Sequence, residues 1–265
     1  MITDSFSMSS QPVINLESIA GPQKHLIDTC ILTFSDVIMR DVLNSLPCEK
    51  IAEICTCRDH TPVYAFSWEG KKIGVFLCHV GAAMAGSDAV ELNWLTGAEK
   101  LIVFGSCGCL SQEKTKGRLI VPTAAYRDEG MSYHYAPPAD YIPVRNADFL
   151  AEVFEANGFP WVKGKIWTTD AFYMETREKV RRRKAEGCIA VEMEVAGVQA
   201  VCDYHGFELY DFLAAGDVVD QEVYTPDGLH RANHSTDKLD VALAVARAVG
   251  ERAQGAGKRE QGKDR

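Results

Sequence analysis

Apolar and polar positions along residues 28–250 form two alternating patterns. Short runs rich in β-branched and aromatic residues predict strands at 28–34, 71–81, 100–108, 118–126, 162–170 and 208–217. Between them, apolar residues at helical spacing predict helices at 36–46, 87–97, 146–159, 193–206 and 235–250. Because strands and helices alternate, we expect one α/β domain with a mostly parallel central sheet and helices on both faces.

The two ends of the chain differ from its middle in composition. Residues 1–20 are polar, and residues 251–265 are charged and glycine-rich. We therefore expect a flexible N-terminal segment, a domain over residues 21–250 and a disordered C-terminal tail.

Charge and cysteine content narrow the possible classes of function. The formal net charge of −9 argues against the broad basic surface that nucleic-acid-binding proteins usually need. No apolar run is long enough to cross a membrane, and the first residues lack the features of a secretory signal, so we expect a cytoplasmic protein without a membrane partner. The nine cysteines include no CxxC pair and no zinc-like Cys/His spacing, which predicts neither a disulfide framework nor a bound metal.

The ends of the predicted strands carry candidate chemistry, because ligands of α/β sheets bind beyond the carboxyl ends of strands. Gly105, Ser106 and Gly108 lie at the end of an apolar run, where small residues let backbone N–H groups approach an anion. A simple tight turn is an equally good interpretation of this pattern. Asp217 ends another apolar run and can act as a general acid, although a turn or capping role is commoner.

Two further segments point to a ligand with a ring and hydroxyl groups. The segment TTDAFYMET contains Phe172 and Tyr173, which can stack on a planar ring or simply pack in the core. The apolar segment 188–201 contains Glu192 and Glu194, although burying an unpaired carboxylate is costly. One glutamate at a helix N-terminus is the structural interpretation, and a rigid carboxylate for a polar ligand is the functional one. Together with the strand ends, these residues predict a pocket for a nucleoside and phosphate.

Four motifs occur in the order seen in the nucleoside phosphorylase family, which they resemble: GSCG (105–108), DAFY (170–173), VEMEVAG (191–197) and AAGD (214–217). The segment at 126–138 is similar to a part of uridine phosphorylases. The resemblance implies a three-layer α/β/α sandwich around a mixed, partly barrel-like sheet. It also implies a homo-oligomer, a hexamer or a dimer, that uses inorganic phosphate as co-substrate and no other cofactor.

The resemblance implies a role for each matched residue. Glu194 would accept hydrogen bonds from the ribose 2′- and 3′-hydroxyls, with Met193 packing on the sugar and Glu192 lining the same pocket. Asp217, assisted by Arg231, would protonate the departing base. The expected phosphate-binding residues are Gly81, Gly105, Ser106 and Arg58 of a neighbouring subunit, and the expected base-binding residues are Phe172, Cys107 and Gly108.

The sequence also departs from the family pattern. Val103 stands where phosphorylases of this family have a phosphate-binding Arg, and Asp36 and Arg40 only loosely match a Gly-Asp-Pro-x-Arg motif. Thr176 and Glu178 replace the Gln and Arg with which uridine phosphorylases bind uracil, so we expect a purine-type nucleoside.

The resulting hypothesis is a pentosyltransferase that converts a ribonucleoside and phosphate into base and ribose 1-phosphate, a step of purine salvage. A nucleoside hydrolase of the same fold is the alternative that Val103 suggests, with Asp36 as the nearest carboxylate to activate water. A nucleoside-binding protein without catalysis is the third hypothesis.

Overall fold

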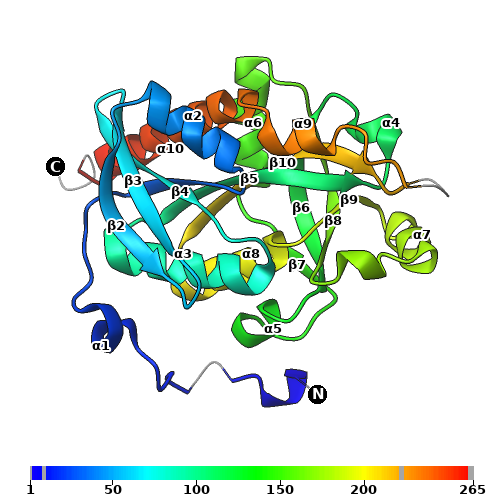
Figure 1. The fold of residues 1–265 in the computed structure, drawn as a ribbon, viewed down its shortest axis with the longest axis horizontal. Helices are drawn as coiled ribbons and strands as arrows, with labels where there is room; N and C mark the ends of the chain where they lie inside the picture. The colour runs from blue at the N-terminus through cyan, green and yellow to red at the C-terminus, as the bar shows by residue number, and fades with distance from the viewer. Residues whose placement is uncertain (1, 8–9, 221–223, 262–265) are drawn as a thin grey trace.

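The computed structural model describes residues 2–7, 10–220 and 224–261. Ten strands form one sheet in this part of the chain (Figure 1). Their bounds are β1 (Thr29–Thr33), β2 (Glu49–Cys55), β3 (His60–Trp68), β4 (Lys71–Leu77), β5 (Lys100–Cys109), β6 (Leu119–Asp128), β7 (Tyr141–Pro143), β8 (Trp161–Thr169), β9 (Cys188–Glu192) and β10 (Glu208–Val218). All six predicted strands are therefore confirmed.

Five strands close into a ring, because β5 pairs with both β9 and β10, and β6 and β8 link β10 back to β9. β1, β4, β3 and β2 extend the sheet from β5. This confirms the mixed, barrel-like sheet that the resemblance implied.

The mostly parallel sheet expected from the alternation is wrong, since β5–β9, β6–β10 and the β2–β3–β4 meander are antiparallel. The hairpin of β2 and β3 was not predicted because β2 has a single buried residue, with the others half-buried or exposed, and no continuous apolar run.

Helices cover both faces of the sheet, which completes the three layers (Figure 1). One face carries α2 (Asp36–Ser45), α6 (Ala147–Asn157), α9 (Leu229–His234) and α10 (Asp237–Gln261). The other carries α3 (Ala82–Thr96), α5 (Ser132–Tyr135) and α8 (Val195–His205). The remaining helices are η1 (Ile2–Ser5), α1 (Leu16–Ala20), α4 (Gln112–Thr115), η2 (Phe172–Met174) and α7 (Arg177–Ala185).

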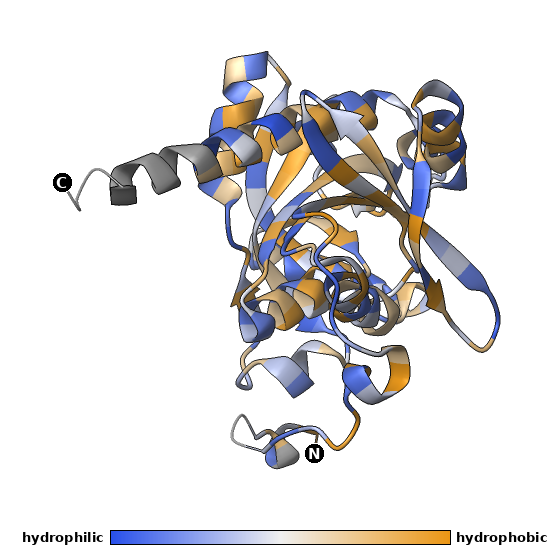
Figure 2. Ribbon diagram, turned by 90° about the vertical axis from the view of Figure 1, so that its left-hand side faces the viewer, coloured by the Kyte–Doolittle hydropathy of each residue, from blue (hydrophilic) through white to orange (hydrophobic). Residues whose placement is uncertain are grey.

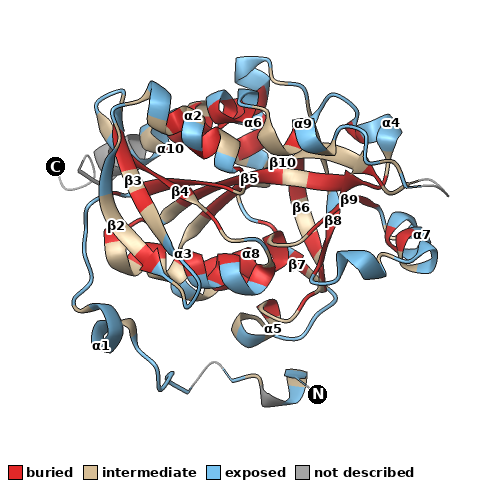
Figure 3. Ribbon diagram, in the orientation of Figure 1, coloured by how far each residue is buried: buried red, intermediate tan, exposed pale blue. Residues whose placement is uncertain are grey.

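The hydrophobic core lies on both sides of β5. Ile102 and Phe104 join the cluster under α2, α6 and α10, whereas Leu101 and Val103 join the cluster under α3 and α8. Successive side chains of a strand point to opposite faces, so this apolar strand is buried by both helix layers. Apolar residues concentrate on the sheet and on the helix faces that cover it (Figure 2), and β5 is buried along most of its length (Figure 3).

Some helix boundaries differ from the predicted ones. α3 begins at Ala82 rather than near residue 87, because Gly81 adopts a φ of 98° and turns the chain directly from β4 into the helix. α10 continues through Gln261, beyond the domain end expected at 250, and α1 lies in the segment expected to be flexible. The tail residues 262–265 lie outside the described residues. In the described part of the chain, no helix combines the length and the apolar character needed to span a membrane.

Candidate active site

The candidate site forms around the carboxyl-terminal half of β5. There β9 pairs with β5 at Gly108 and Val191, and β10 pairs with it at Cys107 and Ala215. This pairing brings together the residues that follow β9, those that end β10 and the GSCG segment. The three motifs are far apart in the sequence, and the closed ring places them side by side.

Glu194 lies between β9 and α8 and is fixed by the loop that follows β4. The Gly81 N–H donates a hydrogen bond to its Oε1 at 2.6 Å. Burial raises the pKa of the Glu194 carboxyl. The predicted ribose-binding carboxylate is thus rigidly held in a desolvated place. Met193, beside it, is half-buried.

Glu192, the other carboxylate of the motif, is turned toward the backbone at the start of α8. Its Oε2 accepts hydrogen bonds from the N–H groups of Glu194 at 2.6 Å and Val195 at 2.8 Å, at the start of α8. The Thr168 hydroxyl donates to its other oxygen and accepts from the Ala196 N–H. Burial, with the nearby Glu194 charge, raises the pKa of Glu192. Glu192 therefore supports the N-terminus of α8 and the loop carrying Glu194, rather than offering free oxygens to a sugar.

Asp217 lies against the backbone of Gly108. A methyl group placed on Gly108 would be 3.7 Å from Asp217 Oδ1, an ordinary contact, and 2.8 Å from the side chains of Val191 and Val219. The packing of the two valines therefore requires glycine here, and Asp217 lies beside it. Tyr224 lies near Asp217: burial, and after it the Asp217 charge, raises the pKa of Tyr224. Glu175 is also close to Asp217. Burial, and after it the Asp217 charge, raises the pKa of Glu175 to about 7. This end of the site combines a carboxylate with a protonatable carboxyl group.

The aromatic pair follows β8 in the short helix η2. The ring centroids of Phe172 and Tyr173 are 4.0 Å apart, and the residues are 48% and 90% exposed. Core packing is therefore not their role. Asp170 accepts a hydrogen bond from the Gly130 N–H at 2.9 Å, which ties the start of this loop to the end of β6.

Polar side chains of β5, α2 and α9 form two hydrogen-bonded pairs, one of which includes Ser106 of the GSCG segment. The Ser106 hydroxyl donates to Asn233 Oδ1 on α9. The hydroxyl of Ser35, which caps α2, lies 2.8 Å from Nδ1 of His234 on the same helix as Asn233. Sequence analysis identified Ser106 but not its partners. Ser35 could have been found from the sequence, because it lies between a predicted strand and a predicted helix. No pattern in the sequence predicts the short helix α9.

Lys238 lies beneath this group and is only 4% exposed. Its Nζ donates to the carbonyl oxygens of Ala232 and Asn233, the last turn of α9. Burial lowers the pKa of Lys238 to about 8, so the amino group keeps a charge at neutral pH. A cation at a helix C-terminus is favourable, and this one fixes the helix that carries Asn233 and His234.

The arginines considered from the sequence do not gather here. Val103 is 2% exposed in the core, and Arg40 is largely exposed and paired with Asp36. Arg58 is exposed in the turn between β2 and β3, and Arg231 lies on the exposed side of α9. Within one described chain, the polar end of the site is built from hydroxyl, amide and imidazole groups instead.

Two other predicted residues of the GSCG region are accounted for by packing. Cys107 is 3% exposed and its thiol donates to the Ala214 carbonyl at 3.6 Å, so this side chain belongs to the core rather than to a base site. The backbone of Gly105 is covered by Phe34, whose ring would lie 3.2 Å from an added methyl group. A side chain at this position would require the Phe34 ring to shift by a few tenths of an ångström.

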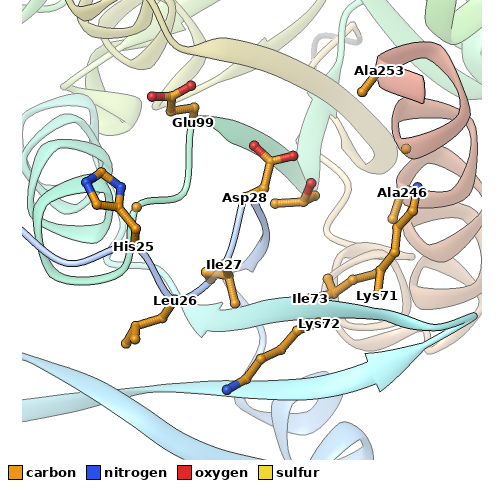
Figure 4. Close-up of a pocket in the computed structure, with 13 residues that line it drawn as sticks. His25, Leu26, Ile27, Asp28, Lys71, Lys72, Ile73, Glu99, Ala246 and Ala253 are labelled. Atoms are coloured by element: carbon orange, nitrogen blue, oxygen red, sulfur yellow. The ribbon is translucent and has the colours of Figure 1, made fainter. Parts of the chain in front are cut away.

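A hollow of about 640 Å³ lies elsewhere, at the amino ends of β1 and β4 (Figure 4). His25, Asp28 and Lys71 line it, together with residues of α10. None of the motif residues reaches it, so we place the candidate site at the carboxyl ends of the strands.

Comparison with known proteins identifies the family of the chain. Residues 29–253 match the model of the Phosphorylase superfamily. A DeoD-type purine nucleoside phosphorylase of Myxococcus xanthus is 29% identical over 69% of this chain and 77% of its own length, and one of Bacillus cereus is 26% identical over 68% and 77%.

Solved structures are similar in fold. A futalosine hydrolase mutant of Helicobacter pylori has a TM-score of 0.65 at 19% identity, covering 82% of this chain and 99% of its own. An AMP nucleosidase of Bacteroides thetaiotaomicron has a TM-score of 0.68 at 17% identity, covering 86% and 91%. The match over most of the chain, on this fold, shows that the protein belongs to the phosphorylase superfamily.

Proposed function

We propose that this protein cleaves the N-glycosidic bond of a ribonucleoside. The observation that carries the proposal is the pair of carboxylates on either side of β5, Glu194 held by the Gly81 N–H and Asp217 lying against Gly108. A ribose between them presents its diol to Glu194 and its base to Asp217. Charge-assisted hydrogen bonds from two hydroxyls to one carboxylate orient the sugar strongly.

In the proposed mechanism, the bond between C1′ and the base breaks through an oxocarbenium-like state. In its protonated form, Asp217 transfers its proton to the departing base nitrogen and becomes a carboxylate, with Tyr224 close beside it. Met193 packs on the sugar, and Glu194 holds it so that C1′ faces the nucleophile.

We propose phosphate as the nucleophile. Ser106, Asn233, Ser35 and His234 offer hydrogen-bonding groups where it would lie, and the buried charge of Lys238 is directly behind α9. The similarity to purine nucleoside phosphorylases supports this choice. The products are a free base and ribose 1-phosphate.

Hydrolysis is the second candidate, because Val103 leaves the site without the family's arginine. A phosphate dianion is best bound by bidentate guanidinium groups, whereas water needs only a base and hydrogen-bond acceptors. His234, oriented by Ser35, is the base for this alternative. Asp36 is less suitable because it is exposed and paired with Arg40.

We propose a purine-type base. Phe172 supplies an exposed ring for stacking, and Glu175, with its pKa raised to about 7, can donate or accept a proton at a base edge. The Glu178 side chain, in place of a uracil-binding arginine, lies exposed on α7.

Product analysis tests the choice of nucleophile. The protein is incubated with inosine, adenosine, guanosine and uridine at zero and at millimolar phosphate, and the sugar product is identified. Phosphorolysis predicts base release that requires phosphate and yields ribose 1-phosphate from the purine nucleosides. Release without phosphate, with free ribose formed, would establish the hydrolase alternative and exclude phosphorolysis.

A further inference from the structure

The hairpin of β2 and β3 brings three metal-binding side chains together outside the candidate active site. Cys55 and His60 are directly opposite each other in the antiparallel pairing. Glu53 is two residues before Cys55, so it points to the same face of the hairpin. The sequence spacing resembles no known zinc pattern, and only the hairpin, which was not predicted, makes these residues neighbours.

The distances between the three donor atoms fit a single small cation. His60 Nδ1 lies 3.1 Å from Glu53 Oε2 and 3.4 Å from Cys55 Sγ, and the sulfur lies 4.0 Å from the same carboxylate oxygen. Bond lengths of about 2.0 Å to oxygen and nitrogen and about 2.3 Å to sulfur, at tetrahedral angles, give separations of about 3.3–3.6 Å. Shifts of a few tenths of an ångström therefore bring all three atoms to one ion.

The chemistry of the donors selects the metal. A thiolate, an imidazole and a carboxylate are the ligand classes of Zn²⁺, whereas Mg²⁺ and Ca²⁺ prefer oxygen alone. The other Glu53 oxygen pairs with Lys50, and Oε2 is directed at His60. Cys55 and His60 are exposed, so an ion can reach them.

We propose that Glu53 Oε2, Cys55 Sγ and His60 Nδ1 bind one zinc ion, with water completing the tetrahedron. None of these three ligands belongs to the candidate active site. Its expected effect is to link the two strands near their turn, which raises the thermal stability of the hairpin.

The test uses the full-length protein after treatment with a chelator. Calorimetric titration with Zn²⁺ is expected to give one site per chain, and titration with Co²⁺ is expected to give a thiolate-to-metal charge-transfer band. Cys55→Ser and His60→Asn should each weaken zinc binding by more than about tenfold, since even outer-shell changes cost that much. Loss of the band in Cys55→Ser identifies the sulfur ligand.

Cys57→Ser is the matched control, because Cys57 is an exposed cysteine in the same turn outside the cluster. This variant should bind zinc as the wild type does. Circular dichroism and melting of the metal-free variants check that each folds. The proposal is overturned if no saturable site is found, or if Cys55→Ser and His60→Asn bind zinc as tightly as Cys57→Ser.

Discussion

At the scale of single residues, the two glutamates of the VEMEVAG motif divide two tasks. Glu192 satisfies backbone N–H groups at the start of α8, and Glu194, held by Gly81, is the one that we propose to bind the ribose. The two side chains are the same in chemistry and two positions apart. Glu192 turns back to the backbone at the start of α8, whereas Glu194 turns to the Gly81 N–H after β4. A capping role explains the first carboxylate, and the proposed ribose-binding role explains the second.

The raised pKa of Glu194 predicts a pH dependence of nucleoside binding. The ionised carboxylate is the better acceptor for two ribose hydroxyls, and burial favours the neutral form. The KM for nucleoside should therefore rise as the pH falls from about 8 to about 6, because a larger fraction of Glu194 is protonated. The measurement is a pH series of initial rates. In Glu194→Gln the KM should be high at every pH, and an unchanged wild-type-like KM in this variant would remove Glu194 from ribose binding.

Asp217→Asn tests the proposed acid. An amide of the same shape keeps contact with Gly108 but cannot donate the proton to the departing base. We expect kcat to fall by about 10²–10⁴-fold, the usual contribution of general acid catalysis. Glu175→Gln is a matched control in the same part of the site and should reduce kcat much less. Near-wild-type turnover in Asp217→Asn would contradict the assigned role.

At the scale of elements, buried side chains fix the ends of the two helices nearest to the candidate site, the start of α8 and the end of α9. Glu192 and Thr168 hold the start of α8, while Lys238 holds the end of α9. Unsatisfied backbone groups at helix ends must find partners, and here the partners are buried side chains next to the site. These contacts set the positions of Glu194, at the start of α8, and of Asn233 and His234, at the end of α9.

Glu192→Gln should alter stability in a pH-dependent way. The folded-state pKa of Glu192 is raised above the unfolded value, so the folded state binds more protons and this residue destabilises the fold increasingly as the pH rises above the ordinary carboxyl range. Glutamine keeps an acceptor for the N–H groups of α8 but has no such titration. Urea denaturation at pH 5 and pH 8 should show the variant gaining stability relative to wild type at the higher pH. A constant or opposite difference would contradict this assignment.

Lys238→Met should loosen α9 and remove the buried charge near Ser106 and Asn233. We expect the KM for phosphate to rise by about tenfold or more, equivalent to about 1.4 kcal/mol, while the KM for nucleoside changes little. Lys238→Arg keeps a charge and should recover part of the loss. Equal changes in both KM values would indicate a general loss of structure instead, and a melting curve for each variant distinguishes the two.

At the scale of the whole molecule, the ring of five strands converts dispersed motifs into one site. The six apolar strands and both helix layers could be predicted from the sequence because burial on both faces leaves a clear apolar pattern. The partly exposed strand β2 and the antiparallel pairing of β9 with β5 could not be predicted. The direction of a strand and the identity of its partner leave no periodic signal in a single segment.

The candidate site was predicted in part for the same physical reason. Glu194 and Asp217 follow apolar runs, and the roles proposed for them come from the resemblance. Asn233, His234 and Lys238 could not be inferred, because their contribution depends on where the short helix α9 packs against β5 and β10. The buried position of Cys107 likewise depends on which face of β5 its side chain occupies.

The measurement that tests the account most directly is base release from purine ribonucleosides by the wild-type protein, Glu194→Ala and Asp217→Asn, followed with saturating phosphate present. The account predicts that wild type releases free base over many turnovers, that Glu194→Ala loses this activity at ordinary substrate concentration, and that Asp217→Asn binds nucleoside but releases base slowly. Tight nucleoside binding by the wild type with no base released, across purine and pyrimidine nucleosides and with or without phosphate, would contradict the central claim and leave a binding protein.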